Sequence, residues 1–143
     1  MNEKQAPILI VDDEPEMCWI LEKIIRRTGF TCMTAMSASE AMTLTKSNQF
    51  SMAFLDAKLP DIDGLDLALK LRKINARLPI VIVSGYFYQD DPTIEGVLQE
   101  GLIDAFVAKP FDHDEILNAI TRYAGGREKF TFITGIDSIV AIP

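Results

Sequence analysis

The strongest constraint on the fold is the alternation of short apolar runs with longer amphipathic stretches. Residues 7–11 (PILIV) and 79–83 (PIVIV) are rich in β-branched residues and contain no polar position. Such runs are typical of strands that are buried on both faces of a sheet. Apolar residues recur at helical spacing between the runs, as they do in residues 14–28. Strand and helix therefore alternate along the chain, about five times by this pattern.

This alternation predicts a parallel sheet, because each parallel connection needs a crossover helix. We expect an α/β fold of the doubly wound, flavodoxin-like type: a five-stranded parallel sheet in the order 2-1-3-4-5, with helices on both faces. Pro15 and Gly29 are placed to begin and end the first helix, and Ser37 and Glu40 have the spacing of a capping box. The expected strands are 7–11, 30–35, 50–55, 79–83 and 104–108, and the expected helices are 14–28, one from 37–40 onward, 65–74, 91–100 and 112–123.

Composition limits the possible classes of protein. The 143 residues correspond to one domain, and 48% of them are hydrophobic, so the chain can bury a core. A formal net charge of -7 argues against broad binding of nucleic acids or anionic membranes. No apolar stretch reaches the length of a membrane span, and the N-terminus lacks a signal-peptide pattern. Cys18 and Cys32 show no metal spacing. We expect a cytoplasmic protein with reduced thiols.

Polar residues follow four of the five expected strands. Asp12 and Asp13 come after the first strand, Asp56 after the third, Ser84 after the fourth and Lys109 after the fifth. Because the ends of parallel strands lie along one edge, these side chains should meet in the crevice between strands one and three. Three crowded carboxylates need a compensating cation, and oxygen ligands suit Mg²⁺.

Such a cluster fits phosphoryl transfer, which depends on positioning and charge neutralisation. A carboxylate can act as the nucleophile and form an acyl phosphate. Asp56 is the best candidate, because it stands alone at its strand end and faces the acidic pair. Asp12 and Asp13 could instead cap the first helix, and Asp56 could begin a turn. The combination with Ser84 and Lys109 favours the chemical interpretation.

Four segments resemble the receiver domain of bacterial two-component response regulators. They are ILIVDDEP at 8–15, FLDAKLPDIDG at 54–64, IVIVSGY at 80–86 and FVAKPF at 106–111. Each segment alone is a weak signal, but all four in order are highly specific. The resemblance covers residues 5–124.

The resemblance implies a metal site and a phosphoacceptor. Asp13 would bind Mg²⁺ directly, and Asp12 would act mainly through water. Asp56 would be both the phosphoacceptor and a metal ligand. The backbone carbonyl of Lys58 would be a further ligand.

The resemblance also implies a switch and its partners. Ser84 would be the switch hydroxyl, Lys109 the phosphate-binding lysine, and Phe106 the aromatic that turns inward on activation. The phosphoryl donor would be a sensor histidine kinase or a phosphotransfer protein. The domain would assist its own phosphorylation and dephosphorylation but would not be an enzyme otherwise. Its altered surface would act on a downstream output protein or form a homodimer.

Two alternatives stay open. The chain could be the N-terminal receiver fragment of a multidomain transcriptional regulator. It could instead be a metal-dependent phosphatase with an Asp nucleophile, although such enzymes carry a DxD arrangement after the first strand, which this sequence lacks. Residues 125–143 follow Gly125-Gly126 and alternate in polarity, so they could form a hairpin or begin a truncated output region.

Overall fold

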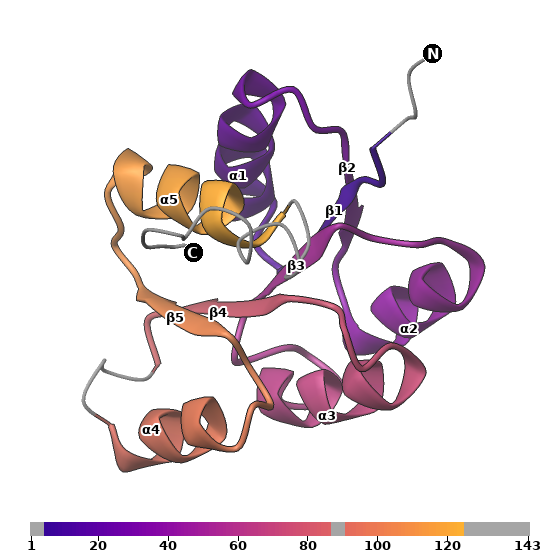
Figure 1. Ribbon diagram of the computed structural model, residues 1–143, viewed down its shortest axis with the longest axis vertical. Coiled ribbons are helices and arrows are strands. Elements are labelled where there is room, and N and C mark those ends of the chain that lie inside the picture. The colour runs from indigo at the N-terminus through magenta and orange to yellow at the C-terminus, as the bar shows by residue number, and fades with distance from the viewer. Residues whose placement is uncertain (1–4, 87–90, 125–143) are drawn as a thin grey trace, which may run out of the picture.

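A five-stranded parallel sheet forms the centre of the molecule (Figure 1). The computed structural model describes residues 5–86 and 91–124. The sheet order β2-β1-β3-β4-β5 confirms the prediction from sequence. The first strand is in register with both of its neighbours from the amino end, with Ile8 opposite both Cys32 and Met52. The strands are β1 (Ile8–Val11), β2 (Cys32–Ala35), β3 (Met52–Leu55), β4 (Ile80–Ser84) and β5 (Ala105–Ala108).

Helices cover both faces of this sheet. In Figure 1, α1 and α5 lie on one side, and α2, α3 and α4 lie on the other. Each face therefore has its own buried apolar layer, and β1, β3 and β4 contribute alternate side chains to the two layers. The helices are α1 (Pro15–Arg27), α2 (Ala38–Ser47), α3 (Gly64–Ile74), α4 (Pro92–Gln99) and α5 (His113–Tyr123).

The helix ends follow the local signals in the sequence, with one difference at α2. Gly29 follows α1 with φ 93°, in the left-handed region that favours glycine. Ser37 accepts a hydrogen bond from the Glu40 amide at 3.1 Å, as the capping box predicts. The Glu40 carboxylate accepts from the amide of Met36 at 2.9 Å, however, and not from the amide of Ser37. The Glu40 side chain therefore bonds to the amide of the residue before the N-cap, and not to the N-cap amide itself.

Three large apolar residues are more exposed than their residue types alone predict. Trp19 is 60% exposed on α1. Leu69 and Ile74 of α3 are 49% and 41% exposed. Within residues 5–86 and 91–124, no helix has the length and apolarity that crossing a membrane requires.

Candidate functional site

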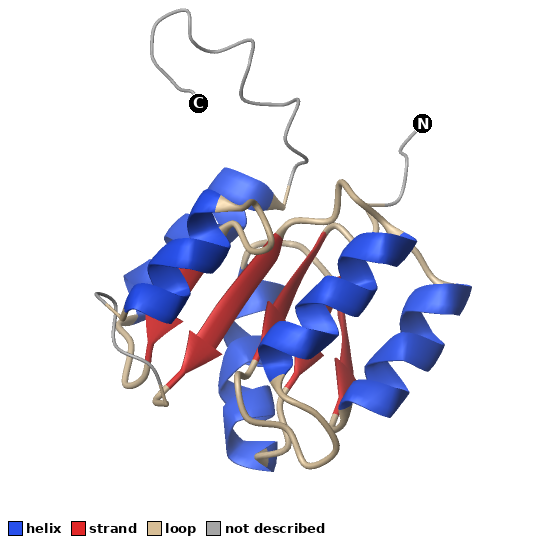
Figure 2. Cartoon of the chain, turned by 90° about the horizontal axis from the view of Figure 1, so that it is seen from below, coloured by secondary structure: helices blue, strands red, loops and turns tan. Residues whose placement is uncertain are grey.

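The carboxyl ends of the strands bring the predicted polar residues to one edge of the sheet. Figure 2 shows the strand arrows pointing to the same edge, where the loops gather. Val11 and Leu55 end β1 and β3 directly opposite one another. The next residues, Asp12 and Asp56, therefore follow adjacent strands, and the Asp56 amide donates to the Val11 carbonyl at 2.8 Å.

Three carboxylates meet at this edge. One oxygen each from Asp12, Asp13 and Asp56 lies within 4.8 Å of the others. The side chains of Asp12 and Asp56 are buried, with residue exposures of 2% and 8%, whereas Asp13 is exposed. The cluster thus has two carboxylates in its floor and one open to solvent.

Lys109 supplies the positive charge of the cluster. Its Nζ lies 3.1 Å from Asp12 Oδ2, 3.6 Å from Asp56 Oδ1 and 3.5 Å from Glu14 Oε1. Burial by itself lowers the pKa of the ammonium group, but the hydrogen bond to Asp12 and the attraction of the other acids outweigh it. The pKa of Lys109 is therefore raised, and the group stays protonated at neutral pH.

Burial also changes the titration of the two floor carboxylates. It raises the pKa of Asp56 to about 6, with the attraction of Lys109 opposing the change and the charge of Asp12 adding to it. The pKa of Asp12 is raised by burial too, although the Glu14 amide and Lys109 oppose this. One ammonium group does not balance these carboxylates, so the site favours a further cation.

The backbone holds Asp12 in a fixed orientation. Its Oδ1 accepts from the Glu14 amide at 2.9 Å, and its Oδ2 accepts from Lys109 at 3.1 Å. Its main-chain carbonyl accepts from the Cys18 thiol at 3.2 Å. Both carboxylate oxygens of Asp12 are thus engaged within the protein. The contacts of Glu14 and Cys18 were not foreseen from the sequence.

Ser84 and Phe106 lie on the adjacent strands β4 and β5. Ser84 ends β4 opposite Ala108, and its residue exposure is 1%. Its hydroxyl accepts from the Tyr86 amide at 2.9 Å. Phe106 is 9% exposed and belongs to the apolar layer that covers the α4 side of the sheet. Its ring is therefore directed inward in this structure.

The loop after β3 is closed at its base by backbone contacts. Lys58 and Asp63 form an antiparallel bridge, and the Gly64 amide donates to the Ala57 carbonyl at 2.7 Å. A Cβ on Gly64 would lie 2.0 Å from the Asp56 carbonyl oxygen, so only glycine fits where α3 begins. The Lys58 ammonium lies 4.1 Å from the centre of the Tyr86 ring. The loop thereby returns tightly past Asp56.

The donor set of this edge fits a hard divalent cation. Carboxylate and carbonyl oxygens are the ligands of Mg²⁺, which keeps several waters and binds with phosphate groups. The exposed side of the cluster, where Asp13 lies, leaves room for those waters. The Lys58 carbonyl belongs to the same loop as Asp56.

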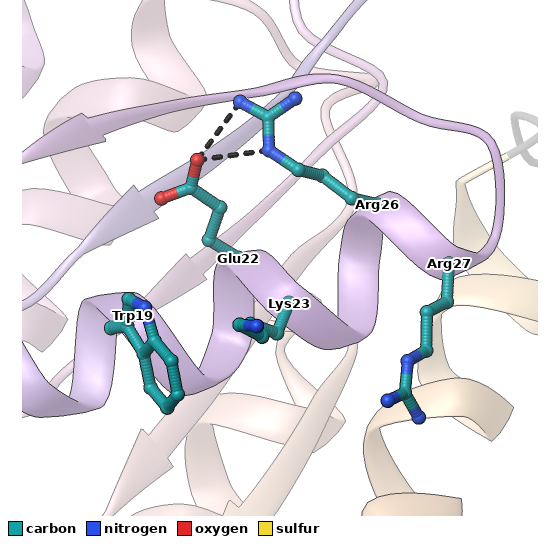
Figure 3. Close-up of a pocket in the computed structure, with 5 residues that line it drawn as sticks. All are labelled: Trp19, Glu22, Lys23, Arg26 and Arg27. Carbon is teal, nitrogen blue, oxygen red and sulfur yellow. Dashed lines mark hydrogen bonds and ion pairs between the residues drawn. The ribbon is translucent and has the colours of Figure 1, made fainter.

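A hollow on α1 lies apart from the carboxylate cluster, none of whose residues line it. Its volume is about 410 Å³. Figure 3 shows Glu22 turned toward Arg26, with Trp19 and Lys23 beside them on the same helix. Arg26 donates to Glu22 at 2.9 Å, and the Lys23 ammonium lies 4.8 Å from the Trp19 ring centre. Arg27 completes the lining. This surface is positive and partly aromatic, unlike the acidic edge.

Known proteins share this fold and these sequence segments. Residues 8–121 match the response regulator receiver domain family. The chain is 31% identical over 119 residues to the DNA-binding transcriptional regulator NtrC of Proteus hauseri, covering 83% of this chain and 24% of that protein. It is 30% identical over 123 residues to the sporulation initiation phosphotransferase F of Bacillus subtilis, covering 86% of this chain and 94% of that protein. It thus spans nearly all of one relative but only a quarter of the other.

Solved structures are similar as well. The response regulator TrrA of Thermotoga maritima, in complex with Mg²⁺-BeF, has a TM-score of 0.71 at 27% identity, covering 82% of this chain and 98% of that chain. A CheY-like receiver domain protein of Methanospirillum hungatei has a TM-score of 0.76 at 26% identity, covering 83% and 93%. The chain therefore belongs to the response regulator receiver domains of two-component systems, as its four sequence segments predict.

Proposed function

We propose that this domain is a phosphorylation switch in which the Asp56 carboxylate accepts the phosphoryl group. The observation that supports this most is the position of Asp56. Its carboxylate is buried beside Lys109 Nζ at 3.6 Å and within 4.8 Å of the oxygens of Asp12 and Asp13. A pKa of about 6 leaves it largely ionised at neutral pH and therefore nucleophilic.

The proposed reaction is a displacement at phosphorus. One Asp56 oxygen forms the new O–P bond while the P–N bond of a donor phosphohistidine breaks. The bonding electron pair passes to the imidazole nitrogen, which takes up a proton when required. Lys109 neutralises charge on the transferring group, and the Ser84 hydroxyl, which accepts from the Tyr86 amide, donates its own proton to a phosphoryl oxygen.

Asp13, Asp56 and the Lys58 carbonyl would hold Mg²⁺ directly, and Asp12 would act through water. This division is supported by the contacts of Asp12, whose two carboxylate oxygens already accept from Glu14 and Lys109. It is also supported by the exposure of Asp13. When bound, the ion neutralises negative charge on the carboxylates and on the phosphoryl oxygens.

Phosphorylation would be transmitted by Ser84 and Phe106. The phosphoryl group adds nearly two negative charges and strong acceptor oxygens beside Ser84 and Lys109. If Ser84 shifted toward the phosphoryl group, it would leave a space at its former position. The Phe106 ring, which packs in the apolar layer, would occupy that space. The surface beyond would then change its affinity for a downstream output protein or a second copy. The donor would be a cytoplasmic sensor histidine kinase or a phosphotransfer protein.

The extent of the domain is part of this proposal. We take residues 5–124 as the receiver domain, in line with the matched range 8–121. Residues 125–143, expected as a hairpin or the start of an output region, lie outside the described residues. The coverage of only 24% of NtrC supports the alternative that the chain is the receiver part of a longer regulator.

Phosphorylation by a small acyl phosphate tests the proposed function without a kinase. The wild type should gain one phosphoryl mass with Mg²⁺ and lose it in hydroxylamine, and chelation of Mg²⁺ should suppress the gain. Asp56→Asn should gain none. Asp114→Asn, which removes an exposed acid of α5, is the matched control and should label like the wild type. Equal labelling of Asp56→Asn would disprove the assignment.

A further inference from the structure

Asp61 joins two segments that are far apart in sequence. Its Oδ1 accepts from the Ala38 amide at 2.9 Å, and its Oδ2 accepts from the Ser39 amide at 2.8 Å. The donors open α2, 23 and 22 residues earlier in the chain. Asp61 itself lies in the loop after β3, which carries the Lys58 carbonyl. A single exposed carboxylate therefore ties this loop to another helix.

These bonds are part of the cap of α2. The first amides of a helix have no partner within the helix. Here Ser37 binds the amide of Glu40, and Asp61 binds the two amides before it. The backbone amides that Asp61 accepts lower its pKa, so the bonds are charge-assisted at neutral pH. The cap is thus shared between a local residue and a residue of the β3–α3 loop.

The loop is held at two places as a result. At its base, the Lys58–Asp63 bridge and the bond from Gly64 to Ala57 fix where the chain leaves and returns. Beyond the base, the two hydrogen bonds of Asp61 join the loop to the start of α2, while Leu59 and Ile62 pack against the apolar layer on the same face. Lys58 is one end of the Lys58–Asp63 bridge, so its backbone moves with the segment that runs from Lys58 to Gly64. The direction of the Lys58 carbonyl therefore depends on how that segment is oriented.

We propose that Asp61 is a positioning residue for the metal site: by binding the N-terminus of α2, it orients the loop that carries the Lys58 carbonyl. This inference rests on the proposed function, in which that carbonyl is a metal ligand. Groups that orient metal ligands typically account for 10–100-fold in metal affinity. If Asp61 served α2 alone, its removal would weaken the helix and leave the metal site intact.

Asp61→Ala and Ser37→Ala separate these roles. Both remove cap hydrogen bonds from the same helix end, but only the first releases the loop. The dissociation constant of Mg²⁺ alone, measured by calorimetry, should rise about 10-fold in Asp61→Ala and stay within about two-fold of wild type in Ser37→Ala. Asp61→Asn keeps one acceptor oxygen, so its dissociation constant for Mg²⁺ should lie between those of the other two variants. Thermal unfolding would verify that each variant is folded at the temperature used.

Hydrogen exchange gives a readout that needs no metal. The Gly64 amide, bonded to Ala57 at the base of the loop, should exchange faster in Asp61→Ala than in wild type. Its exchange rate in Ser37→Ala should equal that of wild type. Equal Mg²⁺ affinity and equal Gly64 exchange in the two variants would overturn the inference while the proposed function stands. A wild type that binds no Mg²⁺ would instead overturn the metal site and this inference together.

Discussion

Partly buried groups of opposite charge meet at both ends of the sheet, and the two contacts differ in how many acids surround each cation. Arg72 and Asp104 lie 3.3 Å apart near the amino ends of β4 and β5, and each side chain is 15% exposed. Lys109 lies beyond the carboxyl end of β5, where it faces Asp12 at 3.1 Å and Asp56 at 3.6 Å. The first contact joins a guanidinium to a carboxylate, and the second places Asp12, Asp56 and Glu14 around the Lys109 ammonium group.

The Arg72 pair is a structural clamp. The guanidinium donates to the carbonyls of Leu78 and Leu102, and Asp104 also accepts from the Ile80 amide at 2.8 Å. These bonds connect α3 to the segments that enter β4 and β5. These partners all belong to the fold itself, so the contact serves to connect its elements. The carboxylate cluster keeps an excess of negative charge, so it remains able to bind a cation and to react.

Breaking the clamp should have the largest effect on stability. Arg72→Ala removes the guanidinium that contacts Asp104 and the Leu78 and Leu102 carbonyls, which we expect to lower the free energy of unfolding by about 3 kcal/mol. Urea denaturation would measure it. The folded fraction should still accept a phosphoryl group at the wild-type rate, because Arg72 is remote from the site.

Arg26→Ala is the control for this change. Arg26 pairs with Glu22 at 2.8 Å on the surface of α1, so its loss should alter stability little. If the two variants unfolded at the same urea concentration, Arg72 would not act as a clamp.

Neutralising Asp56 should raise the free energy of unfolding, whereas Arg72→Ala should lower it. Its pKa of about 6 lies above the usual value, so the folded state binds its proton more tightly than the unfolded state does. The charge therefore costs no stability below the unfolded pKa; the cost grows as the pH rises from that value and is complete above a pH of about 6. Without divalent ions, Asp56→Asn should be about 2 kcal/mol more stable than wild type near pH 7.5 and no more stable near pH 4.

Chemical denaturation at the two pH values would measure this difference. Asp114→Asn is again the matched control, because Asp114 is exposed, and it should show no such pH dependence. If Asp56→Asn were more stable than wild type by the same amount at both pH values, burial of the Asp56 charge would not explain the gain in stability.

Removing the exposed acid near Lys109 should have the smallest effect. The Glu14 side chain is 65% exposed, although it lies 3.5 Å from the ammonium. Glu14→Gln should lower the free energy of unfolding by less than about 0.5 kcal/mol, and added salt should remove the difference. A loss as large as that of Arg72→Ala would show that solvent does not screen this pair.

The fold and the acidic edge could be predicted because both follow from regular spacing. Strand runs and helical periodicity gave the sheet order, and a strand end then fixes the edge at which Asp56 lies. The contacts of Asp61 with α2 and of Arg72 with Asp104 join residues 22 to 32 positions apart. No periodicity marks such pairs, because they depend on how loops pack after the sheet has formed. The exposure of Trp19 could not be predicted for a different reason: a large aromatic residue is highly buried on average, so its type alone predicts burial.

The most direct test of the central claim is to locate the phosphoryl group. After phosphorylation with an acyl phosphate and Mg²⁺, borohydride reduces an aspartyl phosphate to homoserine, which peptide mass spectrometry can place in the sequence. We predict homoserine at the position of Asp56 and at no other acid. Homoserine in place of Asp12 or Asp13, or in no peptide at all, would contradict the account.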